Sequence, residues 1–99
     1  MGFNRLTDAK AERLALLLEE LGEAQQVIGK ILRHGYKSTH PANLMVNNGQ
    51  LLERELGDVT AAVSLLTDAG DIHASEIASW RVHKMEKVQR YLHHQKKRR

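Results

Sequence analysis

The scarcity of proline constrains the fold of this chain more than any other feature of its sequence. One proline, Pro41, occurs in 99 residues, and long stretches on either side of it are rich in Ala, Leu, Glu, Gln, Lys and Arg. Proline breaks helices because it lacks a backbone N–H, whereas those six residue types are among the better helix formers. The sequence therefore predicts an all-α protein.

Three segments carry apolar residues at helical spacing, each bounded by residue types that cap or end helices. The segment between the first two, residues 35–49, holds Gly, Pro, Ser, Thr and three Asn, and predicts a loop of about fifteen residues. Loops of that length are often functional. The expected helices run from Thr7 or Asp8 to Gly35, from about Asn48 to Gly70, and from about Asp71 to Leu92 before a basic tail.

The length of the chain predicts a single domain over residues 1–95, followed by a short basic tail over residues 96–99. A core of this size is small, and the absence of cysteine excludes disulfides and thiolate metal sites as further support. We therefore expect a bundle of about three main helices per chain that is completed by oligomerisation.

The net charge of +3 comes from the tail, because Lys96, Lys97, Arg98 and Arg99 are four of the fifteen cations and all twelve acids lie before them. Such runs can contact phosphate backbones, but most are solvated, so a nucleic-acid partner is not expected. The sequence has no apolar run long enough to cross a membrane and no signal-peptide pattern, which predicts a cytoplasmic protein without a membrane partner.

Two acids of the second segment fall where the core is expected. With 100° per residue, four apolar side chains lie within about 60° of Glu55, and Asp58 follows at i+3 on the same side. An unpaired carboxylate in an apolar seam is costly, so it must be protonated, paired or bound to a metal. The four apolar neighbours are Leu52, Val59, Ala62 and Leu66.

The first segment repeats this arrangement, since Glu20 and Glu23 also lie at i and i+3 beside apolar positions. If the two apolar faces pack together, four carboxylates meet in one cluster, and oxygen ligands of this kind suit Mg²⁺. The alternative is that the acids form salt bridges with nearby cations or lie on solvated faces. The candidate cations are Lys30, Arg33, Arg54 and Lys84.

Two groups of cations are placed to reach a bound polyphosphate. Lys84, with Lys87 beside it, falls on the apolar side of the third segment, although a lysine there can also snorkel or neutralise an acid. Lys30 and His34 continue the line of Glu20 and Glu23 toward the loop, where they could hold phosphate at the mouth of the site.

The sequence Glu19-Glu20-Leu21-Gly22-Glu23, followed by Glu55-Leu56-Gly57-Asp58, resembles the EExxE and ExxD motifs of the MazG-like all-α nucleoside triphosphate pyrophosphohydrolases. The resemblance covers most of the chain. The stretch between the motifs is longer than is usual in that family, and the excess lies in residues 35–49, so the role of this loop in substrate choice does not carry over.

The resemblance implies a hydrolase that cleaves a nucleoside triphosphate between its α and β phosphates and gives the monophosphate and pyrophosphate. It implies Mg²⁺ as cofactor, with Mn²⁺ as a possible substitute, and a homodimer or homotetramer in which protomers complete each other's bundles. By position, the metal ligands would be Glu20, Glu23, Glu55 and Asp58. Glu19 would orient the attacking water or hold a further cation.

Base and ribose recognition is expected from the loop and from aromatic or amide groups. Asn48 and Trp80 are the candidates retained, although a tryptophan at such a position is more often part of a core. Three further side chains of the loop offer similar groups, namely Tyr36, Asn43 and Asn47.

Two other classes of function remain open. A non-catalytic helical binding module would use the acids as structural salt bridges and its basic tail to contact nucleic acid, and would not depend on Mg²⁺. A related pyrophosphohydrolase would act on phosphoribosyl-ATP, deoxyuridine triphosphate or deoxycytidine triphosphate. A histidine metal site is disfavoured, because no two of the six histidines stand at i and i+4 on one helix.

Overall fold

A computed structural model describes residues 2–96 of the chain, and it is helical apart from a small two-stranded sheet. The helices are α1 (Asp8–His34), α2 (Asn48–Asp68) and α3 (Ala74–Lys87), which continues as the single 3₁₀ turn η1 (Val88–Arg90). The strands are β1 (Thr39–His40) and β2 (Asn43–Asn47). The prediction of an all-α protein is confirmed.

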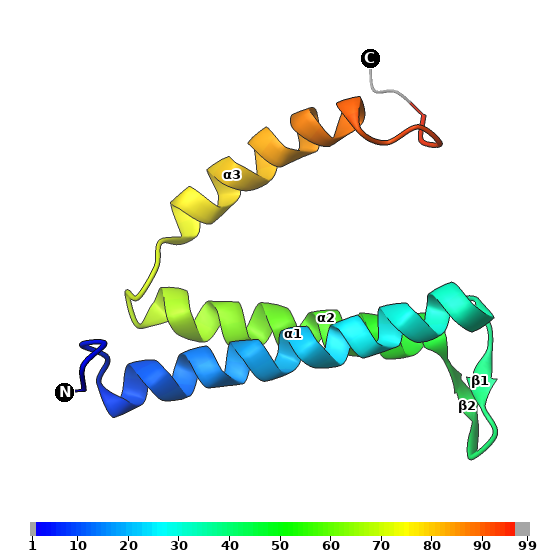
Figure 1. Ribbon diagram of the computed structural model, residues 1–99, viewed down its shortest axis with the longest axis horizontal. Helices are drawn as coiled ribbons and strands as arrows, with labels where there is room; N and C mark the ends of the chain where they lie inside the picture. The colour runs from blue at the N-terminus through cyan, green and yellow to red at the C-terminus, as the bar shows by residue number, and fades with distance from the viewer. Residues whose placement is uncertain (1, 97–99) are drawn as a thin grey trace.

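Helices α1 and α2 form an antiparallel pair that contains the core (Figure 1). Ala24 and Val27 of α1 are buried, as are Ala62 and Leu66 of α2, each of which exposes 1% of its surface. These are positions at which the periodicity of the sequence places the apolar faces. The packing of the two faces holds α1 and α2 at a fixed register.

Local signals set the ends of both helices. The hydroxyl of Thr7 accepts a hydrogen bond from the Lys10 N–H, and Gly35, at a φ of 90°, ends α1. Asn47 and Gln50 form a capping box at the start of α2, in which each side chain accepts a hydrogen bond from the other's backbone N–H.

Residues 35–49, predicted as a loop, instead contain a β-hairpin at the far end of the helix pair (Figure 1). The apolar run Leu44-Met45-Val46 supplies most of β2, while Pro41 occupies the turn, where no ladder N–H is needed. Backbone N–H groups of Asn48 and Gly49 donate back to the carbonyls of Ser38 and Tyr36, at 2.9 Å each. These bonds join the segment between α1 and β1 to the first turn of α2 and so close the base of the hairpin.

Helix α3 diverges from the α1–α2 pair (Figure 1) and contains no buried residue. It begins at Ala74 rather than near Asp71, because Gly70 has a φ of 79° and the Asp71 side chain is held by Arg13. In residues 2–96 the apolar side of α3 is not covered by the other two helices, and Trp80 exposes 65% of its surface.

Within residues 2–96, no helix combines the length and the apolar character that crossing a membrane requires. Of the predicted basic tail, Lys96 is described, and residues 97–99 lie outside the described part of the chain.

Candidate metal centre

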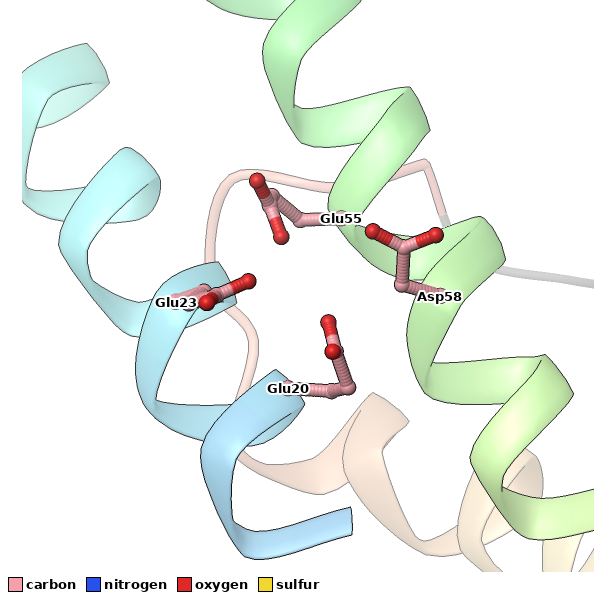
Figure 2. A group of neighbouring side chains, drawn as sticks. All are labelled: Glu20, Glu23, Glu55 and Asp58. Atoms are coloured by element: carbon pink, nitrogen blue, oxygen red, sulfur yellow. The ribbon is translucent and has the colours of Figure 1, made fainter. Parts of the chain in front are cut away.

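Four carboxylates converge midway along the α1–α2 pair (Figure 2). Glu20 and Glu23 come from α1, and Glu55 and Asp58 come from α2. One oxygen of each carboxylate lies within 4.8 Å of the chosen oxygens of the other three. We refer to these four residues as the acid cluster.

The acid cluster results from the positions of the acids in the sequences of the two helices. In each helix two acids stand three residues apart, which places them one above the other on one side. That side borders the apolar stripe, so the packing that buries Ala24 and Ala62 also draws Glu20, Glu23 and Glu55 into a half-buried position. Asp58 stays exposed at the edge.

No protein group in the described chain compensates the charge of this cluster. Oε2 of Glu20 and Oε2 of Glu55 are buried and have no hydrogen-bond partner. The ion pair found within residues 2–96, between Arg13 and Asp71, lies elsewhere. The salt-bridge alternative, with Lys30, Arg33, Arg54 or Lys84 as partners of the acids, is therefore not what the described residues show.

The electrostatics of the cluster disfavour the charged forms of two carboxyls. Burial raises the pKa of Glu20 above its ordinary value, and the negative charges of Glu23 and Asp58 raise it further. Burial also raises the pKa of Glu55, followed by the effect of the adjacent Glu23 carboxyl and of Asp58. A cation placed among the four would remove the repulsion and satisfy the orphaned oxygens.

The donor set fits a hard divalent cation. All four groups offer carboxylate oxygens, which Mg²⁺, Mn²⁺ and Ca²⁺ accept, and there is no nitrogen or sulfur donor in the cluster to favour a softer metal. Four carboxylates leave coordination positions for water and for substrate oxygens, as is usual for Mg²⁺ in proteins that bind phosphates.

The other predicted site residues fall into three groups. Glu19 lies exposed on α1, next in sequence to the acid cluster but outside it. Lys30, His34 and Asn48 line one cleft between the end of α1, the hairpin and the start of α2. Lys84, Lys87 and Trp80 lie exposed on α3, and the described chain does not pack α3 against the helices that carry the acids.

Asn48 and Trp80 each make a specific contact with another residue of the chain. Asn48 is buried, exposing 6% of its surface, and its side-chain amide donates to the carbonyl of Gly35 at 3.1 Å. Trp80 packs edge-on against His83, with ring centroids 5.4 Å apart. The hydrogen bond from the Asn48 side chain to Gly35 joins the start of α2 to the end of α1.

Arg33 and His40 also line the cleft, although sequence analysis assigned neither of them to substrate binding. Arg33 stands three residues after Lys30, a spacing that already places both on one side of the helix end. His40 carries no comparable signal, because its position depends on the hairpin that the sequence did not predict.

A family model described as the MazG nucleotide pyrophosphohydrolase domain matches residues 9–93. The chain belongs to this family. The match runs from α1 through η1 and includes both acidic motifs, so the resemblance inferred from the motifs is confirmed. Comparisons with curated proteins and with solved structures find no match. Membership of the MazG family places this chain in a family of nucleotide pyrophosphohydrolases, and its acid cluster could hold a metal ion.

Proposed function

We propose that the protein hydrolyses (deoxy)nucleoside triphosphates between the α and β phosphates, giving the monophosphate and pyrophosphate in a reaction that requires Mg²⁺. The observation that carries this proposal is the acid cluster, whose two buried, partnerless oxygens call for a cation, in a chain of the MazG family. Mn²⁺ would substitute, because it takes the same oxygen ligands.

In this proposal Glu20, Glu23, Glu55 and Asp58 are the metal ligands. A divalent cation held there would neutralise phosphate charge and lower the pKa of a bound water. Glu19, exposed one residue before Glu20, would orient the attacking water as a hydrogen-bond acceptor. No covalent nucleophile is required.

The proposal also assigns substrate contacts to basic side chains and includes an oligomer of this chain. Lys30 and His34, beside the hairpin, would contact phosphate oxygens, and Asn48 would contribute to base or ribose contacts through its carbonyl oxygen. Lys84, Lys87 and Trp80 would act on the substrate only if a second copy brings α3 to the cluster. We therefore infer a homodimer or homotetramer, in which the exposed apolar side of α3 is covered.

The test is pyrophosphate release from a panel of canonical and modified ribo- and deoxynucleoside triphosphates, with Mg²⁺ and with a chelator. We expect monophosphate and pyrophosphate as products only when the metal is present. Phosphate release instead of pyrophosphate would contradict the proposed cleavage position. A folded, metal-replete sample that turns over no triphosphate would favour a more specialised substrate or a non-catalytic module.

A further inference from the structure

A cleft of about 280 Å³ opens at the hairpin end of the α1–α2 pair. The last turns of α1, the strand β1 and the first turn of α2 supply its walls. The hairpin, which lies between the two acidic motifs in the sequence, thus builds one side of a concave surface. We call this feature the hairpin cleft.

The hairpin cleft is lined by basic side chains and by no acidic one. Lys30, Arg33, His34 and His40 all contribute, and the remaining lining residues are neutral. Within residues 2–96 neither Lys30 nor Arg33 forms an ion pair, so their charges are available to a ligand. A concave surface with one sign of charge concentrates ligands of the opposite sign.

The position of the cleft relates it to the acid cluster. Lys30 follows Glu23 by seven residues on α1, and Asn48 precedes Glu55 by seven residues on α2. Seven residues are nearly two helical turns, or about 10 Å along the axis, so both pairs lie on the same face of their helices. The cleft therefore continues the surface on which the acids lie, toward the hairpin.

The hairpin also fixes one donor in the cleft. Nδ1 of His40 accepts a hydrogen bond from the backbone N–H of Ala42 at 3.0 Å. A ring nitrogen that accepts a hydrogen bond carries no proton, so in the neutral ring the proton is on Nε2. His40 lines the cleft, its ring orientation is held by the turn, and Nε2 is the donor of its neutral ring.

We propose that the hairpin cleft binds the terminal phosphates of the substrate, the part that leaves as pyrophosphate, with Arg33 and His40 as the residues that discriminate triphosphates from diphosphates. This inference rests on the proposed function for the identity of the substrate. A guanidinium matches two phosphate oxygens at once, and the Nε2–H of His40 provides a third contact. Lys30 adds charge on the side nearer the acid cluster, and Asn48, which lines the same cleft, would then contact phosphate rather than base or ribose.

The same basic residues have a structural explanation that the test must separate. Arg33 and His34 lie in the last turn of α1, where positive charge favours the negative end of the helix dipole. That role would make Arg33 important for stability but not for ligand binding. The helix-dipole explanation does not apply to His40, because His40 belongs to the hairpin.

The first arm of the test measures binding of inorganic pyrophosphate by calorimetry, with Mg²⁺ and with chelator. Arg33→Gln is compared with Lys37→Gln, which removes the same charge from an exposed residue outside the cleft, and His40→Ala with His73→Ala. We expect roughly tenfold weaker binding for Arg33→Gln, the size of a lost charge-assisted hydrogen bond, and a smaller loss for His40→Ala. The two controls should bind as the unchanged protein does.

The second arm measures turnover of nucleoside triphosphates and diphosphates. Arg33→Gln should raise KM for the triphosphate by roughly tenfold while leaving KM for the diphosphate nearly unchanged, because the lost contact is to the last phosphate. If pyrophosphate binds but no triphosphate is hydrolysed, the cleft stands and the proposed reaction fails.

Three results would overturn the assignment of the cleft. The first is pyrophosphate binding that is equal in all five proteins, or absent in the unchanged protein. The second is a lower melting temperature of Arg33→Gln without a change in binding, which would leave the helix-dipole role. The third is a change in the ranking of bases with an unchanged preference for triphosphates, which would assign the cleft to the base.

Discussion

Two acidic sites lie beside α1, the single acid Asp71 and the acid cluster, and their surroundings differ. Asp71, just beyond α2, receives two hydrogen bonds from the Arg13 guanidinium, at 2.7 and 3.1 Å. Among residues 2–96 the acid cluster has no such partner, and two of its oxygens have none at all. The Arg13 guanidinium lowers the pKa of Asp71, whereas burial and mutual repulsion raise the pKa of Glu20 and Glu55.

The difference separates a carboxylate that is paired within the protein from carboxylates that could hold a ligand. The Arg13–Asp71 pair is complete within the chain and fastens the α2–α3 connection to α1. No group in the described part of the chain pairs with the acid cluster, and its repulsion is a cost that a bound cation would offset. Uncompensated charge of this kind in an otherwise regular helix pair is typical of functional sites.

The largest effect should come from removing one charge of the acid cluster. Glu55→Gln keeps the shape of the side chain, and we expect a loss of turnover of about a hundredfold or more, because the ligand set is broken. The metal-free variant should melt at the same temperature as the parent or higher, since a repulsive charge is gone. The measurements are kcat with Mg²⁺ and a melting curve with chelator.

The matched control is Glu53→Gln, an exposed acid of α2 outside the cluster. It should alter neither turnover nor the metal-free melting temperature. Near-normal activity of Glu55→Gln would remove Glu55 from the ligand set.

Asp71 and the acid cluster should affect the pH dependence of stability in opposite directions in the metal-free protein. Glu20 and Glu55 have raised pKa values, so their contribution is intact below the ordinary value of 4.5 and is lost as pH rises through the raised values. Asp71 has a lowered pKa, so its contribution is present above 3.8 and is lost as pH falls through the lowered value.

Urea unfolding across this range, with chelator, should therefore show two limbs of opposite slope. Glu55→Gln should flatten the limb at higher pH and Asp71→Asn the limb at lower pH. Adding Mg²⁺ should restore stability on the higher-pH side only, since a ligand that binds the folded state stabilises it. A single limb that neither variant changes would contradict the contrast between the groups.

A moderate effect is expected from breaking the paired group. Asp71→Asn leaves the Arg13 guanidinium, which is largely covered, without its counter-charge, and we expect the melting temperature to fall by several degrees. Turnover per folded molecule should stay close to that of the parent, because the pair lies outside the acid cluster. Thermal unfolding and kcat on the same sample check both statements, and Asp68→Asn, an exposed acid near the end of α2, is the control.

The smallest effect is expected at the C-terminus. Removing residues 96–99 takes away four positive charges that the proposed reaction does not use. The kcat and KM for the best triphosphate should be unchanged. A large loss would show that the tail takes part in binding.

Helical periodicity predicted those parts of the molecule that depend on local sequence. Thr7 and Gly35 mark the ends of α1 as their residue types indicate, and the wheel of α2 places Glu55 beside residues that are buried in the structure. The convergence of four acids follows once two such faces pack against each other. Capping and amphipathicity are properties of a few neighbouring residues, which is why they can be read from one sequence.

The features that sequence analysis missed depend on contacts between distant residues. The hairpin of residues 39–47 consists of strands of two and five residues that pair across a turn. Strands this short carry little periodic signal in the sequence. The start of α3 is displaced to Ala74 in part because Asp71 bonds to Arg13, 58 positions earlier. Periodicity identified an apolar side on α3 but gave no information about what covers it.

The separation of α3 from the helix pair also supplies an optical reporter. Trp80 is the single tryptophan of the chain, it stands on α3, and it is largely exposed to solvent. Its fluorescence therefore comes from one place, and any event that covers α3 should shift the emission to shorter wavelength. Association of protomers, or docking of α3 on substrate, can be followed in the unlabelled protein by the emission wavelength of Trp80.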